Sequence, residues 1–195
     1  MNLPNQLTVA RFFLTIVFVA ALSSEWRFGY TVGLVVFIAA GVTDYFDGVI
    51  ARRRNLVTDF GKLMDPLADK IMIAAAFICL VPLHALPAWA AIVIISREFL
   101  ITGLRLLAAS KGVVLPSERL GKHKTAWQIV TVIYFLILLA LAEGESAGLI
   151  PAPLLTWRPQ AWLYGGHALV WLTLALTLSS GFGYLWKHRA LIASA

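Results

Sequence analysis

The sequence predicts an all-α integral membrane bundle of about six transmembrane helices, forming one domain over residues 1–195. Two observations lead to this fold class. Hydrophobic residues make up 60% of the chain and the mean hydropathy is +0.82, which is too apolar for an ordinary soluble domain. Several apolar segments also approach about 20 residues, the length that a helix needs to cross a bilayer.

The apolar segments give the helices in order along the chain. The first contains the apolar run 12–22, the second and third flank one group of basic residues, and the fourth and fifth flank another. The sixth follows an irregular stretch, residues 143–159, whose prolines and Trp157 favour an external interfacial loop. We expect the helices over residues 7–24, 28–50, 65–82, 86–109, 123–142 and 162–186.

Basic residues predict the orientation of the bundle, because short cytoplasmic loops retain Lys and Arg. Most of the basic residues outside the apolar segments lie between the second and third segments, between the fourth and fifth, or after the sixth. They are Arg52, Arg53, Arg54, Lys62, Lys111, Arg119, Lys122, Lys124, Lys187 and Arg189. The other side has only Arg27 and Arg158. Both termini are therefore expected in the cytoplasm, with the protein in the cytoplasmic membrane. The net charge of +6 suits anionic lipid headgroups. No nucleic-acid partner is expected, because there is no RNA-binding or zinc signature.

One polar stretch stands out in this apolar chain. Residues 43–70, TDYFDGVIARRRNLVTDFGKLMDPLADK, hold five of its ten acidic residues. At helical spacing, one face carries Asp44, Asp47, Gly48 and Ala51, and a face of the next helix carries Gly61, Asp65 and Asp69. Pro66 fits that helix only in its first turn or at a local break. Two helices joined by a short basic linker would bring four carboxylates together at the cytoplasmic edge.

Four carboxylates at a membrane edge repel one another, so a bound cation is the simplest remedy. Carboxylate oxygens favour magnesium, manganese or calcium, whereas zinc usually recruits His or Cys. Paired metals bridged by carboxylates recur in phosphoryl transfer, and Gly48 and Ala51 leave space for a phosphate or a flat group. The alternative is a solvated loop in which the aspartates pair with Arg52–Arg54 and Lys62.

These residues carry a family resemblance. The pattern Asp44-x2-Asp47-Gly48-x2-Ala51-Arg52-x8-Gly61-x3-Asp65-x3-Asp69 resembles the complete signature of the CDP-alcohol phosphotransferase family, with no position departing from it. The segments LPNQLTVAR, MDPLADK, SREFLITGLR and GKHKTAWQ resemble the members whose acceptor is glycerol 3-phosphate. The likeness extends to about residue 130, and the remaining third supports it only by size and hydrophobicity.

The resemblance implies a six-helix membrane enzyme that transfers the phosphatidyl group of CDP-diacylglycerol to an alcohol and releases CMP. It implies two divalent cations, Mg²⁺ or Mn²⁺, held by Asp44, Asp47, Asp65 and Asp69. Asp69 would also be the general base. The CDP-binding residues would be Asp44, Gly48, Ala51, Arg52 and Gly61. The family also suggests a homodimer.

A second set of basic residues lies beyond this motif. Arg97 falls inside the fourth apolar segment, and Arg105 follows about 12 Å further along the helix axis. Intramembrane arginines are functional by default, and with Lys122 and Lys124 they would form a cationic pocket for the phosphate of the acceptor. The alternatives are that Arg97 pairs with Glu98 or a helix carbonyl, that Arg105 extends to the cytoplasmic surface, and that the lysines are solvated.

Three other functions stay open on the sequence alone. Two use the same chemistry with another acceptor, either phosphatidylglycerol, as in cardiolipin synthesis, or inositol phosphate. The third is a divalent cation transporter. Transport by alternating access needs carboxylates near the middle of the membrane, whereas these carboxylates gather beside three arginines at its edge. The phosphate-binding argument and the resemblance together favour glycerol 3-phosphate.

Overall fold

The structure, a computed structural model, describes the backbone of residues 3–54, 59–110, 112–113 and 119–189. Side chains are described in the same ranges except residues 3–8, 44–54, 59–66, 69, 119–120 and 122. The long helices are α1 (Leu3–Ser23), α2 (Gly29–Arg54), α3 (Asp59–Leu80), α4 (Ala88–Ser110), α5 (Arg119–Ser146) and α7 (Gly166–Lys187). No strand occurs in the described ranges, so the predicted all-α class is confirmed.

Several helix ends differ from those predicted. Helix α2 continues to Arg54 and α3 already begins at Asp59, so the three arginines belong to a helix and not to a linker. Helix α3 is uninterrupted, which places Pro66 beyond its first turn and without a break. Hydropathy detects only the apolar part of a helix, whereas backbone hydrogen bonding continues through its polar residues. A proline is tolerated in such a helix when its surroundings satisfy the freed carbonyl.

The segment between α5 and α7 is more regular than the expected loop. Helix α5 extends to Ser146, and short turns follow: the 3₁₀-helix η1 (Ala152–Leu155), α6 (Arg158–Gln160) and the π-helical η2 (Ala161–Gly165). Proline occurs in the first turn of both η1 and α6, where a missing amide hydrogen costs no helical hydrogen bond.

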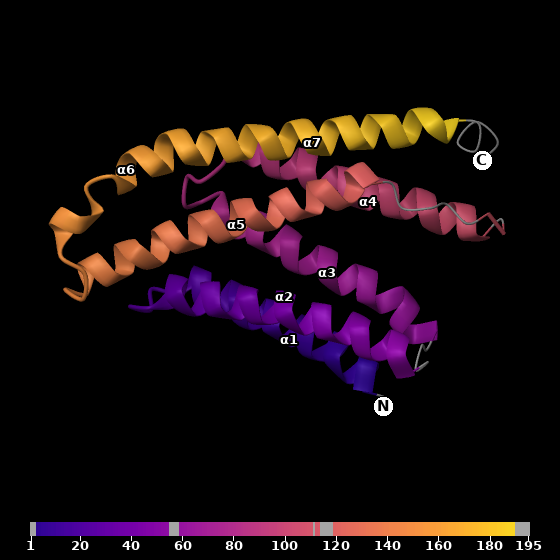
Figure 1. Ribbon diagram of the computed structural model, residues 1–195, viewed down its shortest axis with the longest axis horizontal. Coiled ribbons are helices and arrows are strands. Elements are labelled where there is room, and N and C mark those ends of the chain that lie inside the picture. Colours follow the sequence, from indigo (N-terminus) through magenta and orange to yellow (C-terminus); the bar gives the residue numbers. More distant parts are fainter. Residues whose placement is uncertain (1–2, 55–58, 111, 114–118, 190–195) are drawn as a thin grey trace.

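The long helices run roughly along one axis (Figure 1). Helix α1 packs on α2 and α3, α5 bridges α2 and α7, and α4 packs on α3 and α7. Both termini lie at one end of the bundle, which also holds the carboxyl ends of α2 and α4 and the amino end of α3. The acidic motif and the basic ends of the helices therefore share one end of the molecule.

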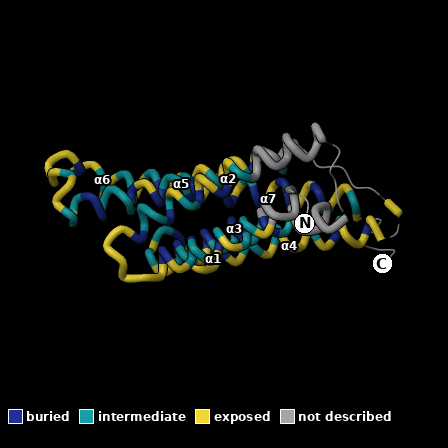
Figure 2. The backbone as a smooth tube through the Cα atoms, turned by 90° about the horizontal axis from the view of Figure 1, so that it is seen from below, coloured by how far each residue is buried: buried dark blue, intermediate teal, exposed yellow. Residues whose placement is uncertain are grey.

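The interior is apolar, and so is much of the outer surface. Phe18, Phe77 and Leu136 are fully buried in the main core. Exposed positions follow the outer sides of the helices (Figure 2), and they include Phe13 and Phe182, which are 65% and 69% exposed. Large hydrophobic side chains that face outwards suit a lipid environment. Within the described residues, two helical segments are long and apolar enough to cross a membrane, His123–Ser146 and Ala152–Lys187.

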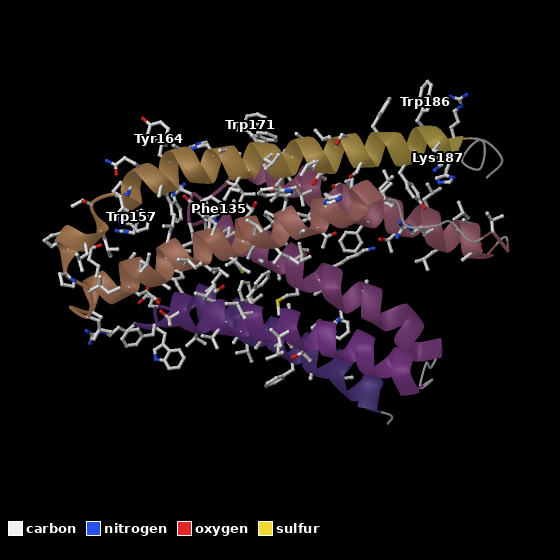
Figure 3. All side chains as sticks on the ribbon, viewed as in Figure 1. Phe135, Trp157, Tyr164, Trp171, Trp186 and Lys187 are labelled. Carbon is white, nitrogen blue, oxygen red and sulfur yellow. The ribbon has the colours of Figure 1, made fainter. Side chains whose placement is uncertain are left out.

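Aromatic residues mark both ends of this last segment. Trp157 and Tyr164 lie at the end that holds α6, and Trp186 lies beside Lys187 at the other end (Figure 3). All three aromatic side chains are exposed. Trp and Tyr gather at the two interfaces of a membrane because their rings are amphipathic, so the positions of these residues fit a span along α7.

A buried carboxylate joins α5 to α2 at the end opposite the termini. Glu143 accepts hydrogen bonds from the backbone amides of Tyr30 and Thr31 and from the Thr31 hydroxyl, each 2.7 Å long. These amides belong to the first turn of α2, where no helical carbonyl can accept them. The carboxylate also complements the positive end of the helix dipole. Glu143 therefore holds α2, the helix that carries the first two motif aspartates, against α5.

Candidate active site

The motif residues lie on two helices near the same end of the bundle. Asp44, Asp47, Gly48, Ala51 and Arg52 fall in the carboxyl half of α2, and Gly61, Asp65 and Asp69 in the amino half of α3. The backbone is helical at every one of these positions, as the predicted shared faces require. Their side chains lie outside the described residues, so their roles stay predictions.

Helix α1 lines α3 next to the motif. The Thr15 hydroxyl donates to the Arg11 carbonyl at 2.9 Å and contacts Met72 Sδ at 3.8 Å. Because α1 and α3 run in the same direction (Figure 1), Arg11 lies one turn towards the part of α3 that carries the aspartates. Its side chain is only 2% exposed. Sequence reasoning did not single out Arg11, although an arginine in the first predicted helix is the kind of residue that signals a functional role.

A network of charged side chains joins α4, α5 and α7. The Glu98 carboxylate accepts from both Arg97 and Lys124, through the same oxygen, Oε1. Arg97 Nη1 lies 3.2 Å from that oxygen, and Arg97 Nη2 donates to Ser180 Oγ at 3.0 Å. Lys124 is 1% exposed. One carboxylate thus balances two cations in an apolar bundle, where an unpaired charge is costly.

This network adjoins the acidic helix. Lys70, the residue after Asp69, donates from Nζ to the Thr102 hydroxyl. Thr102 in turn donates to the Glu98 carbonyl at 2.7 Å. Helix α3 is therefore tied to α4 at the level of the Glu98 network. The chain brings its acidic motif and its buried cations to neighbouring positions from separate helices.

Arg105 lies further towards the carboxyl end of α4. Its Nε donates to the Tyr184 hydroxyl at 3.2 Å, and its guanidinium carbon lies 5.3 Å from the centre of the Tyr184 ring. Tyr184 is 2% exposed and packs with Ile101 and Leu104. Arg105 is therefore held against α7 by its contacts with Tyr184.

The four predicted phosphate-binding residues thus differ in their surroundings. Arg97 and Lys124 come together around Glu98, and the pairing of Arg97 with Glu98 is the one weighed from the sequence. Arg105 contacts Tyr184. The Lys122 side chain lies outside the described residues. Sequence reasoning missed Lys70, Ser180 and Tyr184, whose only signal was a polar or aromatic residue within an apolar segment.

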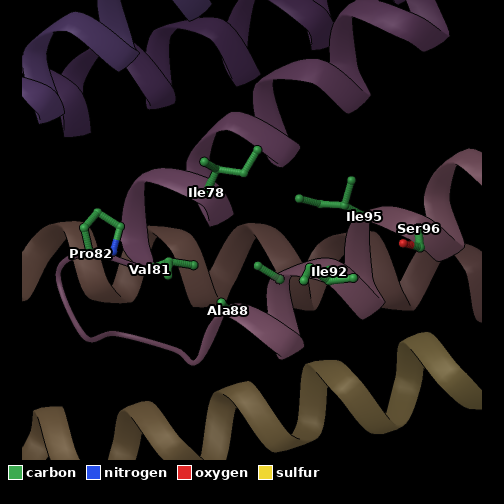
Figure 4. A pocket seen from close by; sticks show the side chains of 8 residues that line it. Ile78, Val81, Pro82, Ala88, Ile92, Ile95 and Ser96 are labelled. Atoms are coloured by element: carbon green, nitrogen blue, oxygen red, sulfur yellow. The ribbon is translucent and has the colours of Figure 1, made fainter.

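An apolar groove of about 500 Å³ lies between α3 and α4. Figure 4 shows Ile78, Ile92 and Ile95 along it. Its lining is almost wholly hydrocarbon, which suits an apolar chain better than a charged headgroup. The groove adjoins the carboxyl half of α3, away from the amino half that carries the aspartates.

The motif aspartates remain the predicted metal ligands. Where side chains are described, no three His, Cys, Asp or Glu residues gather as a metal site. Asp44, Asp47, Asp65 and Asp69 offer only hard carboxylate oxygens. The first two are three residues apart on α2, and the last two are four residues apart on α3. This donor chemistry fits Mg²⁺ or Mn²⁺.

Comparison with known proteins identifies the family. The model of the CDP-alcohol phosphatidyltransferase family matches residues 1–179. A Bacillus subtilis protein named CDP-diacylglycerol–glycerol-3-phosphate 3-phosphatidyltransferase is 45% identical over 148 residues, covering 70% of this chain and 77% of the relative. Proteins of the same name from Rickettsia felis and Salmonella typhimurium are each 34% identical and cover 94% and 96% of this chain, and 93% and 95% of their own lengths. The chain therefore belongs to the CDP-alcohol phosphatidyltransferase family.

Proposed function

We propose that this protein transfers the phosphatidyl group of CDP-diacylglycerol to glycerol 3-phosphate, giving phosphatidylglycerophosphate and CMP. The observation that carries the proposal is the link from Lys70 through Thr102 to Glu98, which sets buried cations beside the helix of the acidic motif. The names of the relatives, which match over nearly the whole chain, support the same donor and acceptor.

The cations explain why the acceptor carries a phosphate. Arg97, Arg105, Lys122 and Lys124 form the proposed phosphate-binding set. Among the described side chains, Glu98 is the one carboxylate that pairs with Arg97 and Lys124, so these two cations carry more positive charge than their partner offsets. A neutral alcohol would leave that charge uncompensated, whereas the compact phosphate of glycerol 3-phosphate accepts charge-assisted hydrogen bonds from it.

Asp44, Asp47, Asp65 and Asp69 are proposed to hold two divalent cations, Mg²⁺ or Mn²⁺. When bound, such ions balance the charge of the donor diphosphate and of the leaving CMP. Gly48, Ala51 and Gly61 have no large side chain, which lets the CDP group approach the helix backbones. Arg52 supplies a positive charge next to the diphosphate, and Asp44 contacts the CDP group as well as the metal.

The transfer needs one proton acceptor and no covalent intermediate on the protein. The acceptor hydroxyl attacks the phosphorus that carries diacylglycerol, and its proton passes to the Asp69 carboxylate. A bond forms between the hydroxyl oxygen and that phosphorus. The bond from this phosphorus to the bridging oxygen of the diphosphate breaks, and CMP leaves with the electron pair.

We also propose that six helices span the cytoplasmic membrane, with the site and both termini on the cytoplasmic side. The support is the shared end of the termini and the basic ends of the helices. In a Cys79→Ser background, an impermeant reagent added outside intact cells should label Ser146→Cys and leave Arg54→Cys unlabelled. Labelling of Arg54→Cys alone would reverse this orientation.

The family resemblance further supports a homodimer, which the molar mass of the purified protein, corrected for detergent, would test.

The activity itself is tested by CMP release. Purified protein with CDP-diacylglycerol and Mg²⁺ should release CMP when glycerol 3-phosphate is added. CMP release that ignores this acceptor but responds to phosphatidylglycerol or inositol phosphate would show that the proposed acceptor is wrong.

A further inference from the structure

Three residues of α7 lie on the face that meets the arginines of α4. Ser180, Gly181 and Tyr184 are all buried, and their spacing places them on one side of the helix. Helices α4 and α7 run side by side at this end of the bundle (Figure 1). These residues belong to the part of the chain whose sequence gave no indication of a site.

Ser180 and Gly181 define the position of Arg97. Ser180 accepts a hydrogen bond from Arg97 Nη2 at 3.0 Å. A Cβ atom at Gly181 would lie 3.0 Å from Arg97 Cγ and 3.2 Å from its Nε, so the arginine chain rests directly on the helix backbone. A methyl group at this position would have to push the arginine away, because such distances are tighter than ordinary van der Waals contact.

Tyr184 defines the position of Arg105. Its hydroxyl accepts from Nε, and its ring lies beneath the guanidinium. Among the described residues this is the only hydrogen bond of the Arg105 guanidinium, and it uses Nε. Both Nη atoms are therefore left to bind two oxygens of an anion, the bidentate arrangement that arginine favours with phosphate.

We propose that α7 is the positioning helix of the acceptor site. Ser180, Gly181 and Tyr184 hold Arg97 and Arg105 in the orientation that binds the phosphate of glycerol 3-phosphate, without touching the substrate themselves. This inference rests on the proposed function, because it takes the two arginines as the acceptor-binding residues.

Steady-state kinetics with matched variants tests the proposal. Tyr184→Phe and Ser180→Ala should each raise the KM for glycerol 3-phosphate by about 10-fold, the effect of a lost hydrogen bond to a charged group. Gly181→Ala should raise it as well, because the added methyl group displaces Arg97. The KM for CDP-diacylglycerol and kcat should stay within about twofold, because only acceptor binding is weakened.

Each variant has a control on the same chain. Tyr134→Phe removes a hydroxyl that donates to the Ala161 carbonyl at 2.8 Å, at the opposite end of the bundle. Ser179→Ala changes the exposed neighbour of Ser180, and Gly183→Ala adds a methyl group where no atom lies within 4 Å. The three controls should keep the wild-type KM for glycerol 3-phosphate. Equal effects in controls and test variants would overturn the proposal.

A double-mutant cycle separates positioning from general damage. If Tyr184 acts through Arg105, then adding Tyr184→Phe to Arg105→Ala should not raise the KM further. Independent, multiplying effects would overturn the proposal at Tyr184, and Ser180→Ala tests it separately at Arg97. A wild-type protein that ignores glycerol 3-phosphate would instead contradict the proposed function. If the wild-type enzyme uses this acceptor and Arg105→Ala raises the KM while Tyr184→Phe behaves like Tyr134→Phe, only the α7 inference fails.

Discussion

The acidic motif of α2 and α3 and the cation network of α4, α5 and α7 differ in how their residues are brought together. The motif aspartates are three or four residues apart on each helix, so helical periodicity alone gathers them in pairs. The network joins Arg97 to Ser180 across 83 residues and Arg105 to Tyr184 across 79. The first arrangement is local in sequence, and the second exists only once three helices have packed.

This difference suggests a division of labour between the two regions. Carboxylates that cannot balance one another need a cation from solution, which suits a site for metal ions and a diphosphate. Glu98 pairs with Lys124, and Tyr184 orients Arg105. Cations that the fold already holds in place suit the recognition of a free anion. The two regions meet where Lys70 reaches Thr102.

The largest effects are expected in the acidic motif. Asp44→Asn, Asp47→Asn, Asp65→Asn and Asp69→Asn should each lower the rate of CMP release by at least about 100-fold, because each removes a charge that the proposed metal site requires. Chelation of divalent cations should abolish activity, and added Mg²⁺ or Mn²⁺ should restore it.

The matched control for these variants is Asp59→Asn, which changes the fifth acidic residue of the segment outside the motif pattern. It should keep most of the activity. If two of the four motif variants also kept most of the wild-type rate, the two-metal interpretation would be wrong and the comparison between the regions would lose its first half.

A large loss of stability is expected at the carboxylate that holds the network together. Glu98→Ala leaves Arg97 and the buried Lys124 without their shared partner, and removal of one member of a buried pair costs about 3 kcal/mol or more. For a chain of this size the midpoint of thermal unfolding in detergent should fall by roughly 6–12 °C.

Glu145→Ala serves as the control for Glu98→Ala. Glu145 pairs with Arg158 at 3.2 Å, and both side chains are about 30% exposed. An exposed pair contributes at most about 1 kcal/mol, so the midpoint should fall by no more than about 4 °C. Equal shifts for the two variants would show that the Glu98 network gives no special stability.

A smaller loss of stability is expected at Glu143, far from both regions of the site. Glu143→Gln weakens three hydrogen bonds at the start of α2 and should cost about 1.5–3 kcal/mol, the range for hydrogen bonds to charged groups. The KM for glycerol 3-phosphate should not change, because this end of the bundle only supports the fold. A raised KM with an unchanged unfolding midpoint would contradict this structural role.

The sequence predicted the helices more reliably than their ends or partners. Apolar length located each long helix, but it stopped α2 at residue 50 and started α3 at residue 65, because hydropathy does not detect helical residues outside the apolar layer. Helical periodicity was enough to put Asp44 and Asp47 on one face. It could not pair Arg105 with Tyr184, because no local rule connects residues 79 positions apart.

Buried charges showed a further limit of sequence reasoning. Pairing of Arg97 with Glu98 was foreseeable because the residues are neighbours, and it was weighed as an alternative to a functional role. The same carboxylate oxygen also accepts from Lys124, 26 residues away. Pairing and function are therefore compatible, since among the described side chains Arg97 and Lys124 share a single carboxylate.

The division of labour is tested most directly by two titrations of Arg105→Ala, one with glycerol 3-phosphate and one with Mg²⁺, each followed by CMP release. The account predicts that half-saturation by glycerol 3-phosphate rises about 10- to 150-fold, the cost of a lost charge-assisted contact, while half-saturation by Mg²⁺ stays at the wild-type value. A shift in the Mg²⁺ dependence with an unchanged response to glycerol 3-phosphate would place Arg105 in the metal and donor region and contradict the account.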